Sequence, residues 1–202
     1  MKIKLNCDLG EGFGLDAQIM KYINMANIAC GYHAGDESSM KESVKLAVLN
    51  SVEIGAHPSY DDKENFGRVS MSCSSKEIKD IVLSQINTLD RYSKEHNTRV
   101  SYVKPHGALY NDMAKDESIY RTILAAISSY DKNIKLMILS TQNNKTYKEI
   151  ASSYNISLLY EVFADRNYND NGTLVSRTKD NAVIHDEKEV LNIIQTLKSD
   201  GY

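Results

Sequence analysis

The chain has 202 residues, of which 42% are hydrophobic and 25% are charged, and its formal net charge is -3. This length is sufficient for one sizeable core, and the composition is ordinary for a soluble globular protein. The weak negative charge gives no reason to expect nucleic acid or an acidic membrane as a partner, and no apolar run is long enough to span a bilayer.

Short apolar runs alternate along the chain with polar loops and with helical periods. The predicted strands, in chain order, are residues 3–8, 27–30, 53–56, 100–104, 135–139 and 157–163, with 173–176 as a further candidate. Apolar residues at helical spacing lie between or after them, namely Met40, Val44, Ala47 and Val48; Ile78, Ile81, Val82, Ile86 and Leu89; Tyr120, Ile123, Leu124 and Ile127; and Val190, Ile194 and Leu197. Ser74 and Glu77 form a capping-box pattern before the second of these helices.

This alternation of strands and helices predicts an α/β fold with a mainly parallel sheet, in a single domain over residues 1–202. Six or seven strand–helix units are compatible with an open doubly wound sheet and with a barrel, and the spacing favours neither. Both arrangements place functional residues at the carboxyl ends of the strands.

Polar residues follow most of the predicted strands, and in a parallel fold these strand ends share one face. The residues concerned are Asp8, His33, Asp36, His57, Lys104, His106, Asp165 and Arg166. Imidazoles combined with carboxylates bind divalent metals and activate water, and without a metal they act as general acids and bases. A histidine in a loop is also commonly just a hydrogen-bonded surface residue, and His96 and His185 are predicted to be structural.

The glycine-rich turn, the cysteines and the cationic side chains indicate a functional role less clearly. The glycines at 10, 12 and 14 lack the lysine of a phosphate-binding loop, so a nucleotide site is unsupported. Cys7 and Cys30 lie in apolar strands, where cysteine is commonly a small hydrophobe, and the lack of CxxC spacing predicts a reducing, cytoplasmic compartment. Arg68, Lys104 and Arg166 are candidates for binding an anionic substrate group.

Several longer blocks carry a family resemblance. They are NCDLGEGFG at 6–14, ANIACGYHAGD at 26–36, IGAHPSY at 54–60, FGR at 66–68, VKPHGALYN at 103–111 and EVFADRNYNDNGTLVSR at 161–177. In these blocks and their order, the chain resembles the LamB/YcsF family. The resemblance implies a distorted β/α barrel of the glycoside hydrolase/deacetylase type. It also implies ATP-dependent opening of 5-oxo-L-proline to L-glutamate, together with partner subunits B and C.

The resemblance also implies a polar pocket and a further strand and helix at the C-terminus. The pocket residues that it indicates are Asp8, Glu11, His33, Asp36, His57, Lys104, His106, Asp165 and Arg166. Family members usually continue into a further strand with a His-Gly-Asp motif and a final helix, whereas this chain stops at Tyr202. The expectation is therefore a barrel that lacks its last strand and leaves an unpaired edge.

Opening a lactam requires a base for water, an acid for the ring nitrogen and cations for the carboxylate or phosphate. Asp8 and His57 are expected to activate water, directly or through a metal held by Asp8, His33, His57 and His106. His106 or His33 is expected to protonate the leaving nitrogen, while Lys104 and Arg166 bind anions.

Glu11, Asp36, Arg68 and Asp165 are the remaining substrate-binding candidates. ATP is expected to bind on a partner subunit. Two alternatives stay open: a stand-alone metal-dependent deacetylase or amidohydrolase, and a non-catalytic subunit that binds oxoproline.

Overall fold

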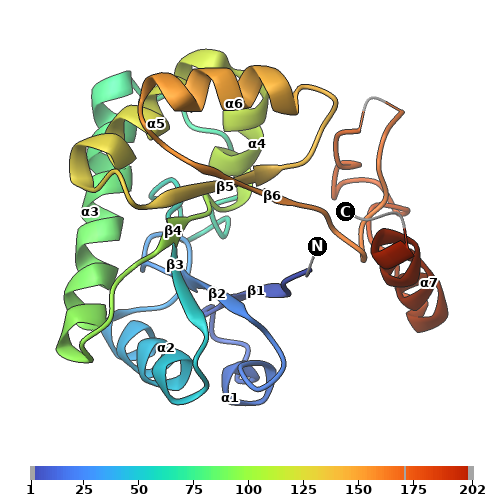
Figure 1. Cartoon of the computed structure of the whole chain (residues 1–202), viewed down its shortest axis with the longest axis horizontal. Coiled ribbons are helices and arrows are strands. Elements are labelled where there is room, and N and C mark those ends of the chain that lie inside the picture. The colour runs from blue at the N-terminus through green and yellow to red at the C-terminus, as the bar shows by residue number, and fades with distance from the viewer. Residues whose placement is uncertain (1–2, 171, 200–202) are drawn as a thin grey trace. The chain divides into compact units, whose positions relative to one another are not determined.

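The computed structural model describes residues 3–170 and 172–199. Its centre is a six-stranded sheet with the order β1-β2-β3-β4-β5-β6, curled into a half-barrel (Figure 1). Pairing from β1 to β5 is parallel throughout. The strands are β1 (Asn6–Leu9), β2 (Met25–Ala29), β3 (Glu53–His57), β4 (Tyr102–Val103), β5 (Lys135–Leu139) and β6 (Leu158–Glu161). The prediction of an α/β fold with a mainly parallel sheet is confirmed.

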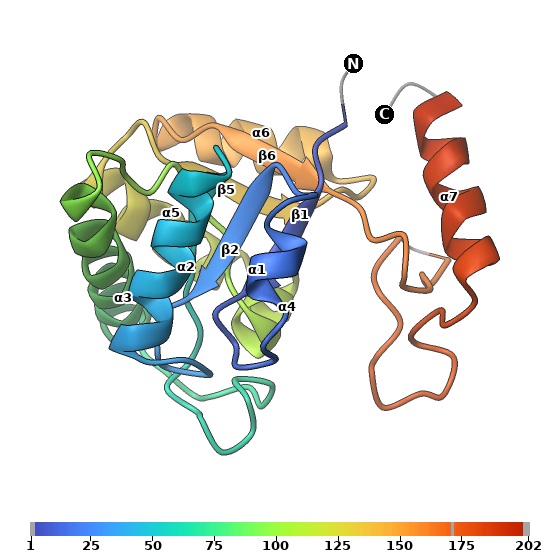
Figure 2. The same cartoon turned by 90° about the horizontal axis from the view of Figure 1, so that it is seen from below.

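Helices connect the successive strands, as parallel pairing requires. The connecting helices are α1 (Asp16–Ile19), α2 (Glu37–Leu49), α3 (Ser75–Glu95), α4 (Gly107–Lys115), α5 (Glu117–Tyr130) and α6 (Asn144–Ser153), and α7 (Glu187–Ser199) follows β6. Figure 2 shows α1 and α2 beside β1 and β2. The predicted capping box is confirmed, because the Ser74 side chain accepts from the Glu77 amide while the Glu77 carboxylate accepts from the Ser74 amide. No helix within the described ranges combines the length and apolar character that crossing a membrane requires.

The buried face of α2 differs from the predicted one. Met40, Val44 and Ala47 are buried as expected, but Val48 is 40% exposed and Ser43 is buried in its place. The Ser43 hydroxyl donates to the Asp16 carboxylate at 3.2 Å, which makes burial of this polar side chain tolerable. A polar residue with a partner therefore completes the i, i+3, i+4, i+7 stripe.

Several strand ends also differ from the predicted ones. The first strand begins at Asn6 because the Leu5 amide bonds to the Asn24 side chain at 3.0 Å rather than to a neighbouring strand. β4 stops before Pro105, which has no amide hydrogen to donate. The candidate strand at 173–176 is wrong: Leu174 forms an isolated antiparallel bridge there.

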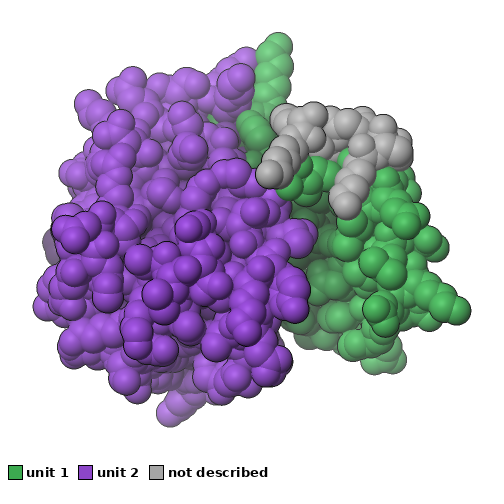
Figure 3. All heavy atoms as spheres, turned by 60° about the horizontal axis from the view of Figure 1, so that its bottom comes forward, with its two compact units in different colours: residues 1–3, 139–147, 160–202 green, residues 4–138, 148–159 purple. Residues whose placement is uncertain are grey.

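Two compact units divide the chain (Figure 3). Unit 2 comprises residues 4–138 and 148–159, and the remaining described residues form unit 1. Unit 2 contains β1 to β4 with the helices that follow them, whereas α7 belongs to unit 1. The single domain that the sequence predicts over residues 1–202 stays a prediction.

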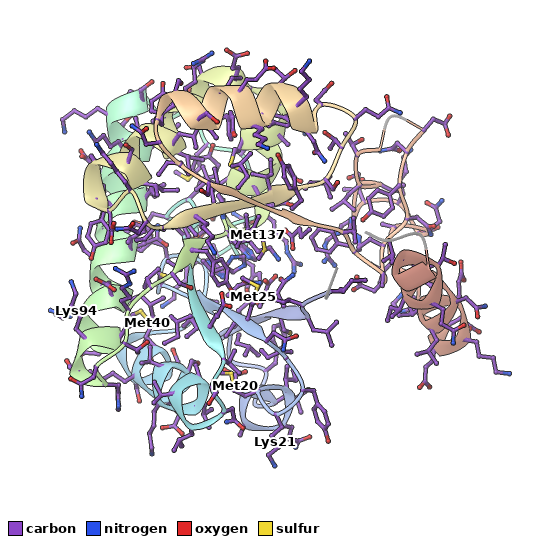
Figure 4. The ribbon with its side chains drawn as sticks, viewed as in Figure 1. Met20, Lys21, Met25, Met40, Lys94 and Met137 are labelled. Atoms are coloured by element: carbon purple, nitrogen blue, oxygen red, sulfur yellow. The ribbon has the colours of Figure 1, made fainter. Side chains whose placement is uncertain are left out.

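A small apolar cluster in unit 2 supports the sheet from within. It contains Met25, Tyr102 and Met137, and Figure 4 shows the two methionines in the interior of the sheet region. A methyl group at Gly55 would overlap the Tyr102 ring, so this packing requires glycine. The Tyr102 hydroxyl donates to Asn27 Oδ1 at 2.7 Å. This hydrogen bond from a core tyrosine fixes the orientation of the Asn27 side chain in β2.

Asp90 stabilises the connection between α3 and β4. Its carboxylate accepts from the Val100 amide at 2.9 Å and the Tyr130 hydroxyl at 2.6 Å, and it pairs with Lys94 at 2.7 Å. We expect Asp90→Asn to lower the free energy of unfolding at pH 7 by about 1–3 kcal/mol, because buried donors lose a charged acceptor. Urea denaturation measures this loss.

The effect of Asp90→Asn should depend on pH. Burial raises the pKa of Asp90, but the bonds from Lys94, Tyr130 and Val100 outweigh it and lower the pKa. Ionised Asp90 therefore stabilises the fold fully above its unfolded pKa of about 3.9, and this contribution disappears as the pH falls through the folded value. The difference between wild type and variant should shrink in acid. The exposed Asp80→Asn is the control, and an equal loss in both variants would contradict the assignment.

Candidate functional site

The carboxyl ends of four strands bring together one carboxylate and three imidazoles in unit 2. Glu11 follows β1, His33 follows β2, His57 is the last residue of β3, and His106 precedes the first turn of α4. All three histidines are buried, with exposed fractions of 1%, 1% and 6%. Glu11, His33, His57 and His106 are referred to below as the histidine cluster.

The potential ligand atoms of the histidine cluster all lie within 4.8 Å of one another. Glu11 Oε1 lies 3.0 Å from His33 Nε2, 3.5 Å from His106 Nδ1 and 3.9 Å from His57 Nε2. His57 Nε2 and His106 Nδ1 are 2.9 Å apart. The arrangement satisfies the sequence expectation that these strand ends converge.

The imidazole rings pack in a defined geometry. His33 and His106 stack with their centroids 3.7 Å apart and their planes 4° from parallel. His57 meets both rings edge-on, at 5.5 Å from His33 and 4.8 Å from His106. The Phe66 ring packs edge-to-face against His33 and His106, with ring centroids 5.4 Å and 5.3 Å apart. Such packing restricts each ring to one orientation.

Each ring nitrogen that faces away from the cluster has a hydrogen-bond partner. His57 Nδ1 lies 2.6 Å from the Lys104 carbonyl oxygen, and His106 Nε2 lies 3.0 Å from the Phe66 carbonyl oxygen. His33 Nδ1 lies 3.0 Å from the Ser59 hydroxyl oxygen. These partners position the inward-facing nitrogens.

Burial keeps two of the rings neutral. It lowers the pKa of His33 despite the nearby Glu11 carboxylate. Burial, together with the neighbouring His57 and His33 rings, lowers the pKa of His106 to about 2. At neutral pH these imidazoles are therefore available as lone-pair donors rather than as cations.

Asp8 lies beside the histidine cluster and is more accessible. Its side chain is 36% exposed, and one oxygen accepts from Lys104 Nζ at 3.0 Å and Asn27 Nδ2 at 2.7 Å. The other oxygen is 3.5 Å from His57 Nε2. Burial opposes ionisation of Asp8, but His57, Lys104 and Asn27 hold its pKa well below the ordinary value. Asp8 is therefore an ionised carboxylate that solvent can reach.

The other sequence candidates make contacts of their own outside the set of four residues in the histidine cluster. Asp36 caps α2 by accepting from the Ser39 amide at 2.8 Å. Arg68 is exposed, with its guanidinium over the Phe66 ring at 4.9 Å. Asp165 and Arg166 belong to unit 1, where Arg166 donates to two backbone carbonyls at 2.9 Å and 2.7 Å.

The thiols do not have the character of activated nucleophiles. Burial raises the pKa of Cys7 to about 11 and that of Cys30 to about 12. Both side chains are therefore protonated at neutral pH, in agreement with the interpretation of these cysteines as small hydrophobes.

Sequence reasoning missed three residues that shape the site, namely Asn27, Ser59 and Phe66. A polar residue inside the apolar run of β2 was the available signal for Asn27, which is fully buried. Ser59 and Phe66 lie in loops beside recognised motifs, IGAHPSY and FGR. Their contacts with imidazole nitrogens and rings arise only from tertiary packing.

Known proteins resemble this chain over nearly its whole length. A model of the LamB/YcsF family matches residues 3–201. The chain is 45% identical to the 5-oxoprolinase A subunit of Vibrio cholerae, over 98% of this chain and 82% of that protein. It is 48% identical to a 5-oxoprolinase A subunit of Pseudomonas putida, over 94% of this chain and 76% of that protein. The lactam utilization protein from Thermus thermophilus has a similar structure, with a TM-score of 0.91, 33% identity, and coverage of 100% of this chain and 82% of that chain.

Proposed function

The chain belongs to the LamB/YcsF family, and we propose that it acts as the A subunit of a 5-oxoprolinase. In this proposal it hydrolyses the lactam bond of 5-oxo-L-proline to give L-glutamate, as part of an ATP-dependent complex with subunits B and C. The names of its relatives and the lactam utilization protein of similar structure support this role. The observation within the chain that carries it is the accessible, ionised Asp8 between Lys104 and His57.

The chemistry of a lactam explains why this arrangement suits it. A five-membered amide is stabilised by resonance, so water adds to its carbon slowly unless the carbonyl oxygen is activated. Phosphorylation of that oxygen by ATP supplies the activation. What remains for this chain is to deprotonate water, to stabilise negative charge and to protonate the ring nitrogen as the C–N bond breaks. The acyl phosphate that this leaves takes up a second water, which releases phosphate and gives the carboxylate of glutamate.

The side chains divide these tasks by position. Asp8 takes the proton from the attacking water, with His57 Nε2 beside it at 3.5 Å. The Lys104 ammonium is nearly buried and lies 3.0 Å from Asp8. It stabilises the negative charge that develops on the oxygen atoms of the lactam carbon as water attacks that carbon. His106 and His33 have lowered pKa values and are poor proton donors at neutral pH, so Asp8, once it has taken the proton of water, passes it to the departing nitrogen. Arg68 is exposed and is assigned to the substrate carboxylate.

The nucleotide is assigned to a partner subunit. The turn at Gly10, Gly12 and Gly14 has positive φ at all three glycines but contains no phosphate-loop lysine. A division of labour follows, in which a partner phosphorylates the lactam and this chain hydrolyses the activated product.

An assay of the isolated chain tests this division. We expect the protein alone, incubated with ATP and 5-oxo-L-proline, to form neither ADP nor glutamate above background. Addition of subunits B and C should produce both. Glutamate formation without partners would contradict the assignment of ATP to a partner, and failure to form glutamate with both partners present would remove the proposed function.

A second function is favoured by the histidine cluster, whose atoms lie within 4.8 Å of one another. Three imidazoles and a carboxylate also suit a stand-alone metal-dependent deacetylase or amidohydrolase. Hydrolysis of simple amides by the isolated chain, without ATP and abolished by a chelator, would favour this second function. Dependence on ATP and partners would favour the first.

A further inference from the structure

The outward-facing ring nitrogens of the histidine cluster determine where its protons lie. The partners of His57 Nδ1 and His106 Nε2 are backbone carbonyl oxygens, which only accept. Both of these ring nitrogens must therefore carry hydrogen. The Ser59 hydroxyl donates its single hydrogen to the Tyr60 carbonyl oxygen at 2.8 Å, so its oxygen accepts from His33 Nδ1. All three outward nitrogens are donors.

In neutral rings, the inward nitrogens then carry lone pairs and no hydrogen. His33 Nε2, His57 Nε2 and His106 Nδ1 face one another and Glu11 Oε1, which is an acceptor as well. His57 Nε2 and His106 Nδ1 approach to 2.9 Å, a hydrogen-bond distance, although neither has a hydrogen to donate in this arrangement. Four acceptors that converge in a buried space repel one another unless a cation lies between them.

We propose that Glu11, His33, His57 and His106 together bind one divalent transition-metal ion, with zinc as the best fit. Nitrogen and carboxylate ligands at about 2.0–2.1 Å around tetrahedral zinc are about 3.3–3.4 Å apart. Four separations within the histidine cluster run from 2.9 to 3.9 Å and so bracket this spacing, and all of its potential ligand atoms lie within 4.8 Å of one another. The outward ring nitrogens donate to three oxygen acceptors, as the second ring nitrogen of a metal-binding histidine ordinarily does.

Asp8 is outside this ligand set, although the sequence predicted it as a metal ligand and did not predict Glu11 as one. Its Oδ1 accepts from Lys104 and Asn27, and a neighbouring ammonium disfavours a second cation at that oxygen. Asp8 instead lies beside the site, where it can accept a proton. A bound metal would supply water of lowered pKa there. The proposal concerns binding alone and does not depend on which reaction the chain catalyses.

Metal binding to the full-length, untagged protein tests the proposal without substrate or partners. After chelator treatment and its removal, the protein is titrated with Co²⁺, whose visible absorption bands report tetrahedral nitrogen and oxygen coordination, and then with Zn²⁺ in competition. We expect one ion per chain, with strong visible bands that zinc abolishes. Elemental analysis after gel filtration measures the stoichiometry.

Two kinds of variant assign the site. Glu11→Gln and His106→Ala each remove a ligand and should weaken binding at least tenfold. Ser59→Ala leaves the ligands in place but removes the acceptor behind His33, and should weaken binding about 10–100-fold. His185→Gln is the matched control, because His185 is exposed and should bind the metal like wild type.

The outcomes are decisive in both directions. Stoichiometric binding that falls in Ser59→Ala and stays in His185→Gln supports the site. Less than stoichiometric binding by the folded wild-type protein overturns it and shows that a shared proton holds the imidazoles together. Equal affinity in wild type, Ser59→Ala and Glu11→Gln also overturns it. Circular dichroism confirms folding of each variant, and the wild-type and Ser59→Ala measurements stand if a ligand variant does not fold.

Discussion

Replacing Asp8 by asparagine is expected to reduce glutamate formation by the assembled complex about 10²–10⁴-fold, the usual contribution of a general base. Asparagine has nearly the same shape and can still accept from Lys104 and Asn27, so the fold should survive. What it lacks is the negative charge that accepts the proton of water. The loss should therefore appear in kcat rather than in KM alone.

The control for Asp8→Asn is Asp61→Asn, a change at an exposed aspartate in the loop after β3. Single-turnover glutamate release, measured with saturating ATP, separates the chemical step from product release. His57→Ala should lose nearly all turnover as well. Near-normal rates in both Asp8→Asn and His57→Ala would remove the assignment of water activation to this pair.

Gly67→Ala is expected to disrupt the site through packing rather than charge. Gly67 has φ of +62°, and a Cβ there would lie 2.8 Å from His33 Cβ and 3.1 Å from His106 Cδ2. The added methyl must push apart the stacked imidazoles and also force a non-glycine residue into the left-handed region, which costs about 1–2 kcal/mol. We expect loss of most activity together with a lowered midpoint of thermal unfolding.

Gly14→Ala separates these two effects. Gly14 also has positive φ, at +73°, but nothing lies within 4 Å of a Cβ built there. It should therefore show the backbone cost of about 1–2 kcal/mol with nearly full activity. If Gly67→Ala and Gly14→Ala lose the same stability and both stay active, the close approach of Gly67 to the imidazoles has no functional consequence.

The sequence predicts which residues form the site better than it predicts the contacts that their side chains make. Strand alternation places His33, His57 and His106 at the ends of parallel strands, and simple topology then brings them together. The same rule assigns Asp36 to the pocket, but its position directly before a helix makes it a cap. Whether a strand-end carboxylate faces the pocket or caps the next helix depends on backbone orientation, which residue spacing does not encode.

The tautomers of the imidazoles were beyond sequence reasoning for a related reason. They depend on the Lys104 and Phe66 carbonyl oxygens and on the Ser59 hydroxyl. A backbone carbonyl has no sequence signature, because every residue contributes one. Likewise, the curl of the sheet follows from strand twist and packing, so the residues alone did not distinguish an open sheet from a barrel.

The residues of the histidine cluster come from positions 11, 33, 57 and 106, at or just after the carboxyl ends of four different strands. Such contacts have high sequence separation, so they form late in folding, after the intervening chain segments have lost their conformational entropy. No single strand–helix unit holds a partial version of the site. Occupancy of the site therefore reports on global rather than local unfolding, and a ligand bound there slows hydrogen exchange across β1 to β4 as one cooperative unit.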